Sequence, residues 1–246
     1  MKSIKESQTM QRKDSIRKAV WQKLYEEGIS EDPFNRIPPF KGQNKAAERL
    51  RRLQIYKDAK RVMVPPDEAQ KQVRLNILND NKILIMATPG LRDGFYELNP
   101  RHIPIKRWTK AITTYGVTKW GRRLFTSYEE IGKIDLLITG AVAVARDGVR
   151  IGKGAGFFDL EYVILRTIGS INEKTPIIAL VDDIQIFDTL PREEKDVAID
   201  FIVTPTQVIN IKTSISRPQG IDWSHLNSKA IKRMRPLAEL FRSIHT

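Results

Sequence analysis

The segment Gly152-Lys-Gly-Ala-Gly156 places three glycines at alternate positions, and it is the strongest sign of chemistry in the chain. A helix-like pattern begins directly after it, near Phe157. Glycine allows positive φ angles and a close approach of the backbone to a ligand. The unpaired N–H groups at the start of a helix bind phosphate, and Arg150 and Lys153 would add positive charge. We therefore predict a phosphate-binding loop.

Two carboxylates, Asp159 and Glu161, follow early in the predicted helix. Carboxylates are favourable in that position because the helix dipole is positive there. Either side chain is also suited to hold Mg²⁺ on bound phosphates, since Mg²⁺ is usually bound by one or two carboxylates together with phosphate oxygens. Both roles stay open at this point.

The loop matches neither of two common nucleotide-binding motifs. The Walker pattern needs four residues between its first glycine and Gly-Lys-Ser/Thr, whereas three separate Gly148 from Gly152, and Gly154 replaces the hydroxyl residue. The Rossmann fingerprint needs two residues between its second and third glycines, and here Ala155 stands alone. A purely structural turn is the alternative explanation of the bare pattern.

A second group of polar side chains follows two predicted strands, over 61–65 and 82–88. Ligand-binding clefts of open α/β sheets lie at the ends of such strands. The residues expected to bind a second substrate there are Asp67, Glu68, Gln70, Arg74 and Arg92. The alternative role for Asp67 is to cap the helix predicted over 69–79, because aspartate is a favoured N-cap residue.

The elements that must position these residues alternate along the chain. Further apolar runs predict strands over 134–139, 177–181, 199–204 and 208–213. Helical spacing of apolar residues predicts amphipathic helices over about 10–27 and 45–58. Near-continuous apolar strands separated by helices indicate an α/β fold with a mostly parallel sheet covered on both faces. We expect a single domain over 1–246, with a basic C-terminal extension over about 214–246 that contains a helical segment.

Composition narrows the classes of function. The 246 residues carry a formal net charge of +13 and no cysteine, which excludes disulfides and cysteine-based zinc sites. The three histidines are scattered, so a histidine metal site is not expected. No apolar run is long enough to span a membrane, and the first residues lack the apolar centre of a secretory signal, so we expect a cytoplasmic protein.

The positive charge suits an anionic partner, either a phosphorylated small molecule or a nucleic acid. The segment from Arg101 to Arg123 has seven basic residues and no acidic ones, with Trp108, Tyr115 and Trp120 between them. Basic and aromatic side chains together can bind nucleic acid. The alternative is a basic surface segment whose aromatic residues anchor it to the core.

The glycine segment also carries a family resemblance. The run Asp147-Gly-Val-Arg-Ile-Gly-Lys-Gly-Ala-Gly-Phe-Phe-Asp159 resembles the signature of the 5-formyltetrahydrofolate cyclo-ligase family, which reads roughly Gly-Arg-Leu-Gly-x-Gly-x-Gly-Tyr-Tyr-Asp-Arg. Weaker matches are Lys13-Asp-Ser-Ile-Arg17 near the start and Pro191-Arg-Glu-Glu-Lys-Asp196 near the end. The resemblance extends over roughly residues 10–210.

The resemblance implies a fold, a reaction and a set of site residues. The fold is a three-layer α/β sandwich related to sugar-phosphate isomerases and CoA transferases. The reaction uses ATP and Mg²⁺ to phosphorylate the formyl oxygen of 5-formyltetrahydrofolate, after which a neighbouring folate nitrogen closes the ring to give 5,10-methenyltetrahydrofolate. The residues carried over to bind ATP are Lys13, Arg17, Gly152, Lys153, Gly154, Ala155, Gly156 and Phe157, with Arg150, Lys153 and Asp159 as the catalytic group and Asp159 at the metal.

The chain also departs from the family signature. The family's Tyr-Tyr-Asp-Arg becomes Phe157-Phe-Asp-Leu160, which loses two hydroxyls and one basic side chain. With Val64-Pro-Pro-Asp-Glu68, the segment resembles a divergent subgroup of cyclo-ligase domain-containing proteins. The alternatives are therefore a nucleic-acid-binding protein on a cyclo-ligase-like scaffold without cyclo-ligase activity, and a sugar-phosphate or CoA-ester enzyme of the same fold.

Overall fold

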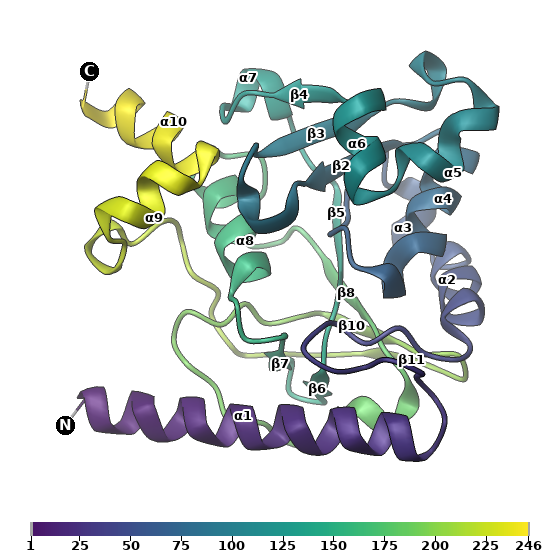
Figure 1. The fold of residues 1–246 in the computed structure, drawn as a ribbon, viewed down its shortest axis with the longest axis vertical. Helices are drawn as coiled ribbons and strands as arrows, with labels where there is room; N and C mark the ends of the chain where they lie inside the picture. Colours follow the sequence, from purple (N-terminus) through teal and green to yellow (C-terminus); the bar gives the residue numbers. More distant parts are fainter. Residues whose placement is uncertain (1, 246) are drawn as a thin grey trace.

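An eight-stranded sheet forms the centre of the fold in the computed structural model, which describes residues 2–245 (Figure 1). The strands are β1 (Arg61–Met63), β2 (Ile83–Ala87), β3 (Phe95–Leu98), β4 (Arg122–Leu124), β5 (Leu136–Gly140), β6 (Ala143–Ala145), β7 (Arg150–Ile151), β8 (Ile177–Leu180), β9 (Ile186–Phe187), β10 (Phe201–Val203) and β11 (Val208–Asn210). The order in the large sheet is β11-β10-β8-β5-β1-β2-β3-β4, and β7-β6-β9 form a small second sheet.

The inner strands of the large sheet, from β10 to β2, run parallel, as the sequence predicted. The two edges of the sheet are antiparallel. β11 pairs with β10 at one edge, and at the other edge β3 pairs with β2 and β4 pairs with β3. β3 and β4 were not predicted from the sequence. Parallel neighbours place the carboxyl ends of β1, β2, β5 and β8 at one edge of the sheet, where a cleft is expected.

Helices cover both faces of the sheet and complete a three-layer α/β architecture. In Figure 1, α2 to α6 lie on one side and α8 to α10 on the other, while α1 runs past the small sheet. The α-helices are α1 (Lys2–Glu26), α2 (Gln43–Arg51), α3 (Gln54–Asp58), α4 (Lys71–Asn79), α5 (Trp108–Ala111), α6 (Thr114–Trp120), α7 (Tyr128–Ile131), α8 (Phe157–Thr167), α9 (Ser228–Arg233) and α10 (Arg235–His245). Short 3-10 turns are η1 (Glu68–Gln70), η2 (Pro89–Leu91), η3 (Pro100–His102), η4 (Ile105–Arg107), η5 (Asp183–Gln185) and η6 (Trp223–His225).

The alternation of side chains along the strands creates two apolar cores. Val62 and Val64 around β1 belong to the core under α1 to α6, whereas Met63 belongs to the core under α7, α8 and α10. Successive strand residues point to opposite faces, so a strand that is apolar at every position fills both cores. This is why the buried strands read as continuous apolar runs. No helix within residues 2–245 is both long and apolar enough to cross a membrane.

Three predicted helices differ from the structure in their bounds. The N-terminal helix begins at Lys2, several residues before the amphipathic pattern starts. The helix expected over 45–58 is two helices, α2 and α3, because Leu53 has an extended conformation with ψ of 138°. The helical segment of the C-terminal extension is likewise divided into α9 and α10.

The C-terminal extension folds back on the sheet. Leu237 and Leu240 of α10 are buried in the core that α8 covers. Glu239 accepts hydrogen bonds from the backbone N–H of Thr126 at 3.0 Å and from its hydroxyl at 2.8 Å, and it pairs with Arg123 on β4. The extension thus covers the antiparallel edge that the sequence did not predict.

The basic segment from Arg101 to Arg123 folds as short helices leading into β4. The Trp108 indole N–H donates to the Ile103 carbonyl at 2.9 Å, and the Arg107 guanidinium lies 5.5 Å from the centre of the Trp120 ring. Both tryptophans pack against the core, whereas Tyr115 is 78% exposed. Two of the three aromatic residues therefore anchor the segment.

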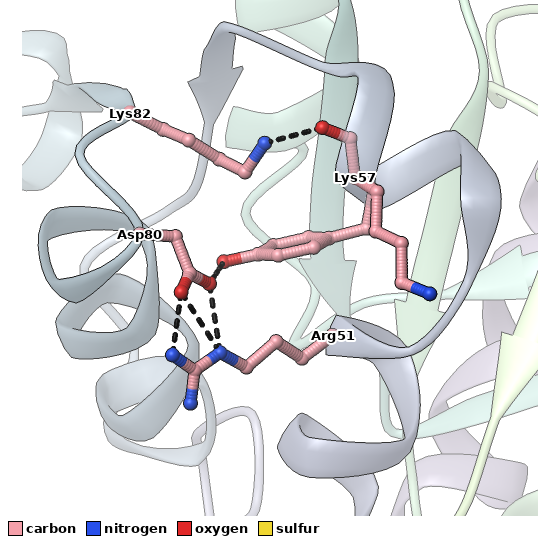
Figure 2. A pocket seen from close by; sticks show the side chains of 5 residues that line it. Arg51, Lys57, Asp80 and Lys82 are labelled. Carbon is pink, nitrogen blue, oxygen red and sulfur yellow. Dashed lines mark hydrogen bonds and ion pairs between the residues drawn. The ribbon is translucent and has the colours of Figure 1, made fainter.

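A cluster of polar residues ties α2 and α3 to the end of α4. Figure 2 shows Arg51 and Asp80 in direct contact, and both line a hollow of about 330 Å³ together with Tyr56, Lys57 and Lys82. The Arg51 Nε–H donates to Asp80 Oδ2 at 2.8 Å, and the Tyr56 hydroxyl donates to the same oxygen at 2.8 Å. Burial alone would raise the pKa of the Asp80 carboxyl, but the hydrogen bonds from Arg51 and Tyr56 outweigh it, and its pKa lies below the usual value.

We expect Asp80→Asn to lower the free energy of unfolding at pH 7 by about 1 to 2 kcal/mol, between the value of an exposed ion pair and that of a buried charged hydrogen bond. The contribution of a carboxyl with a depressed pKa is present above its unfolded-state pKa, about 3.9, and is lost as the pH falls further. The difference between wild type and variant should therefore shrink at pH 3. Urea unfolding at both pH values measures it, with Asp58→Asn on the exposed side of α3 as the control. An equal difference at the two pH values would contradict the assignment.

Candidate functional site

The glycine loop joins β7 to α8 with the geometry of an anion site. Gly154 and Gly156 have φ angles of +103° and +67°, in the left-handed region that favours glycine. Gly156 is the N-cap of α8, and no side chain caps the helix. The first N–H groups of α8 therefore have no side-chain acceptor and are oriented to bind an anion at the loop.

The first helix brings a guanidinium against the loop. The Arg17 Nε–H donates to the Gly152 carbonyl at 2.7 Å, and its other arm pairs with Asp14. A Cβ added to Gly154 would lie 3.6 Å from Arg17 Cζ, an ordinary contact, so the position favours glycine because of its φ angle of +103° and not for lack of space. The structure thus brings Arg17 and the glycine loop together across more than a hundred residues of sequence.

Lys13, one turn before Arg17, is held by two carboxylates from a distant segment. Its Nζ donates to Glu193 Oε2 at 2.8 Å and also bonds to Asp196, and the lysine is 4% exposed. Burial alone would raise the pKa of Glu193, but the bonds from Lys13 outweigh it and the pKa lies below its usual value. The family resemblance includes the segment 191–196 but assigns no role to these two carboxylates.

A buried ion pair closes the loop at its base. Arg150 Nη2 donates to Asp159 Oδ1 at 2.7 Å, and the same oxygen accepts the backbone N–H of Val197 at 3.0 Å. The guanidinium also lies 4.6 Å from the centre of the Phe158 ring. Because Arg150 belongs to β7 and Asp159 to α8, the pair fixes the two ends of the loop relative to each other.

The loop after β1 reaches the glycine loop through a second ion pair. Lys153 Nζ lies 2.9 Å from Asp67 Oδ1. Asp67 does not cap the following turn with its side chain, so the alternative role considered from the sequence is not the one that the structure shows. About a third of the Lys153 side chain is exposed, and an ion pair open to water on this scale is weak.

The other residues expected around the second substrate lie in three different settings. Arg74 is 1% exposed and donates to the carbonyls of Pro65, Asp67 and Ile112, which holds the loop after β1 in place. Burial lowers the pKa of its guanidinium to about 10.

Glu68 is exposed and pairs with Lys71, whereas Arg92 is exposed in the turn that follows β2.

Glu161, the second carboxylate after the loop, lies on the inner face of α8 and is 4% exposed. Burial raises its pKa to about 8, and the negative charge of Asp67 contributes in the same direction. Gln70, which follows Asp67 in η1, is also fully buried. The sequence placed both residues near a site but did not indicate their burial, because a single polar residue within a helix pattern does not reveal which face it occupies.

Asp159 is the metal ligand that the family resemblance implies, so the site fits Mg²⁺ only if the Asp159 carboxylate has an oxygen that can bind the ion. The Arg150 and Val197 N–H groups both bond to Oδ1, so Oδ2 is the oxygen that would bind a metal ion. Among the side chains that the structure describes, which leave out residues 2–5, 225, 230 and 245, no group of three or more acidic or histidine residues is arranged to hold a metal. Mg²⁺ on a nucleotide needs only one or two protein carboxylates, since phosphate oxygens and water supply the remaining ligands.

Comparison with known proteins identifies the family of the chain. A model described as the 5-formyltetrahydrofolate cyclo-ligase family matches residues 9–205. A methenyltetrahydrofolate synthase domain-containing protein from Bos taurus is 35% identical over 237 residues, which cover 93% of this chain and 61% of the relative. A 5-formyltetrahydrofolate cyclo-ligase from Mycolicibacterium smegmatis is 38% identical over 81 residues, 33% of this chain and 39% of that protein.

Solved structures give the same fold. The NMR structure of Aquifex aeolicus 5,10-methenyltetrahydrofolate synthetase superposes with a TM-score of 0.54 at 20% identity, covering 87% of this chain and 99% of the other. At that level of identity the likeness concerns the fold alone. The chain spans about three fifths of the length of the Bos taurus relative.

We expect Asp159→Asn to lower the free energy of unfolding by about 2 to 4 kcal/mol at neutral pH, because it leaves the buried Arg150 charge without a carboxylate. Asparagine keeps the shape and can still accept the Val197 N–H, so the effect isolates the charge. Urea unfolding measures the change. The control is Asp188→Asn, whose side chain is 96% exposed and should change stability by less than about 0.5 kcal/mol. Equal midpoints for the two variants would show that the ion pair does not hold the loop.

Proposed function

We propose that this chain, which belongs to the 5-formyltetrahydrofolate cyclo-ligase family, is an ATP- and Mg²⁺-dependent ligase that converts 5-formyltetrahydrofolate to 5,10-methenyltetrahydrofolate with release of ADP and phosphate. The observation that carries the proposal is the glycine loop at the start of α8, closed by Arg150 and Asp159 and packed on Arg17. It is the part of the fold where backbone N–H groups and basic side chains converge.

ATP binding follows from the loop. The triphosphate would accept hydrogen bonds from N–H groups of the Gly152–Gly156 backbone and the first turn of α8. Lys153 is the mobile cation of the site, because its exposed ion pair with Asp67 can be exchanged for a phosphate. Arg17 and Arg150 are already bonded to the protein, so their role is to add a fixed positive field and to keep the loop in shape.

Asp159 is the residue that would hold Mg²⁺, which when bound would neutralise phosphate charge during transfer. The other contribution of the protein is to position the phosphates. The loop holds the terminal phosphate still, and the dipole of α8 with Lys153 stabilises the negative charge that spreads over its oxygens.

Phosphorylation converts the formyl oxygen, which is a poor leaving group, into part of a phosphate, which is a good one. The formyl oxygen of the folate attacks the terminal phosphorus and ADP leaves. The neighbouring folate nitrogen then attacks the activated carbon, loses its proton, and phosphate departs with the former formyl oxygen. Asp67 lies beside Lys153 at the strand ends, in the position where a second substrate would meet the phosphates.

The departures from the family signature bear on the second substrate rather than on ATP. Of the signature, the phosphate loop keeps Arg150, the three alternating glycines from Gly152 to Gly156 and Asp159, whereas Val149 replaces the first glycine. Lys153 stands at a variable position of the signature. Phe157, Phe158 and Leu160 replace two hydroxyl side chains and a basic one. We therefore infer that nucleotide binding is the better preserved half of the site.

We expect Lys153→Ala to weaken ATP–Mg²⁺ binding by about tenfold, or about 1.4 kcal/mol, because it removes one charge-assisted contact to phosphate. Isothermal titration calorimetry measures the affinity, and the absorbance of methenyltetrahydrofolate reports turnover. Lys57→Ala, an exposed lysine of α3 beside the hollow of Figure 2, is the control and should leave both unchanged. A wild type that neither binds nor consumes ATP would remove the proposal, and ATP binding without methenyl product would restrict it to the nucleotide half.

A further inference from the structure

Lys13 has a different setting in the structure from the one that the family resemblance implies. The resemblance places it among the residues that bind ATP. In the structure its Nζ group bonds to Glu193 Oε2 at 2.8 Å and to Asp196 Oδ2 at 2.5 Å, and the residue is 4% exposed. Carboxylates thus take two of its three N–H donors. A phosphate that approached Lys13 would also meet these two negative charges, which repel it.

The segment that carries the two carboxylates has no regular secondary structure. Residues 188–200, between β9 and β10, form neither helix nor strand. Strand pairing therefore does not fix the path of this segment, and individual hydrogen bonds must do so. The Asp196 carboxylate accepts the Glu193 N–H at 2.7 Å, which closes a turn around the two groups that Lys13 binds.

The same segment continues directly to Asp159. Val197 follows Asp196 in the chain and donates its backbone N–H to Asp159 Oδ1 at 3.0 Å. Val197 is 1% exposed, so water does not compete for this bond. The position of Asp196 therefore sets the position of the Val197 N–H, and the Val197 N–H in turn helps to set the orientation of the Asp159 carboxylate.

One face of α1 holds both parts of the site. Arg17 lies four residues after Lys13, so the two side chains project from the same face of the helix. Arg17 donates to the Gly152 carbonyl at 2.7 Å. In Figure 1 the helix runs past β6 and β7, the strands that lead into the glycine loop. Through Arg17 and Lys13, α1 thus contacts the glycine loop and also the segment that bonds to Asp159.

We propose that Lys13 is a positioning residue, which holds the segment 193–197 so that the Val197 N–H fixes the orientation of Asp159, the group that would hold Mg²⁺. Lys13 itself does not contact the phosphates. Without its cation, the carboxylates of Glu193 and Asp196 would repel each other and move the segment away from α1. The inference rests on the proposed function, because Asp159 holds Mg²⁺ in that reaction.

The first test uses the protein without any ligand. Hydrogen exchange at the Val197 amide is compared in wild type, Lys13→Met and Lys18→Met. In Lys13→Met this amide should exchange about tenfold faster, because the segment opens locally. The amides of β5, which report the stability of the whole domain, should change by a smaller factor. Lys18→Met is the matched control, since it makes the same substitution at an exposed position of α1, and it should exchange as wild type does.

The second test measures ATP affinity by calorimetry, once with Mg²⁺ and once with EDTA. Lys13→Met should weaken ATP binding by about tenfold with Mg²⁺ and by less than about twofold with EDTA, because the loss acts through the metal ligand. The double variant Glu193→Gln with Asp196→Asn releases Lys13 from its carboxylates. Its ATP affinity should fall with Mg²⁺ present, whereas a lysine that binds phosphate would bind it more tightly once released. Lys18→Met should match wild type in both buffers.

The outcomes separate this inference from the proposed function. Unchanged exchange at Val197 in Lys13→Met would overturn it. So would an equal loss of ATP affinity with and without Mg²⁺, or a gain of affinity in the double variant, because Lys13 would then bind phosphate directly. Missing methenyl product counts against the proposed function alone, since neither test uses turnover. A wild type that binds no ATP would overturn the proposed function and the role toward Mg²⁺, and the exchange at Val197 would still decide whether Lys13 holds the segment.

Discussion

The buried pair between Arg150 and Asp159 is the interaction on which the site depends. An arginine almost without exposed surface is costly unless its charge is paired and its donors are used. Here the carboxylate also accepts the Val197 N–H, and the Phe158 ring lies near the guanidinium. The pair joins the last strand before the glycine loop to the helix after it. Without this pair, the two ends of the glycine loop would not be held at a fixed distance from each other.

Segments far apart in the sequence complete this frame. Arg17 from the first helix donates to the Gly152 carbonyl, and Lys13 of the same helix pairs with Glu193. Asp67, in the loop after β1, pairs with Lys153 of the glycine loop. The parallel sheet makes this convergence possible, because it collects the carboxyl ends of its strands at one edge. The fold and the site are therefore specified together, and residues such as Arg74 act by holding the loop backbone that presents Asp67.

The sequence predicted what depends on local pattern. Apolar runs located the parallel strands, and the alternating glycines located the loop and the start of α8, since both signals lie within a few adjacent residues. It missed β3 and β4, whose pairing is visible only once the sheet edge exists, and the division between α2 and α3, which depends on the extended Leu53. The Lys153–Asp67 pair was also invisible, because its partners are 86 positions apart and only the fold brings them together.

The charge balance of the site differs from that of the whole chain. The chain as a whole has a net charge of +13. Within the site, however, the basic side chains are paired with carboxylates: Arg150 with Asp159, Lys153 with Asp67, and Lys13 with Glu193. In the proposed function, phosphate affinity would therefore come mainly from backbone N–H groups of the loop and α8, together with the exchange of Lys153 from Asp67 to the ligand. That exchange would free the Asp67 carboxylate when the nucleotide binds. Nucleotide binding would thus change the charge in the half of the site that is proposed for the second substrate.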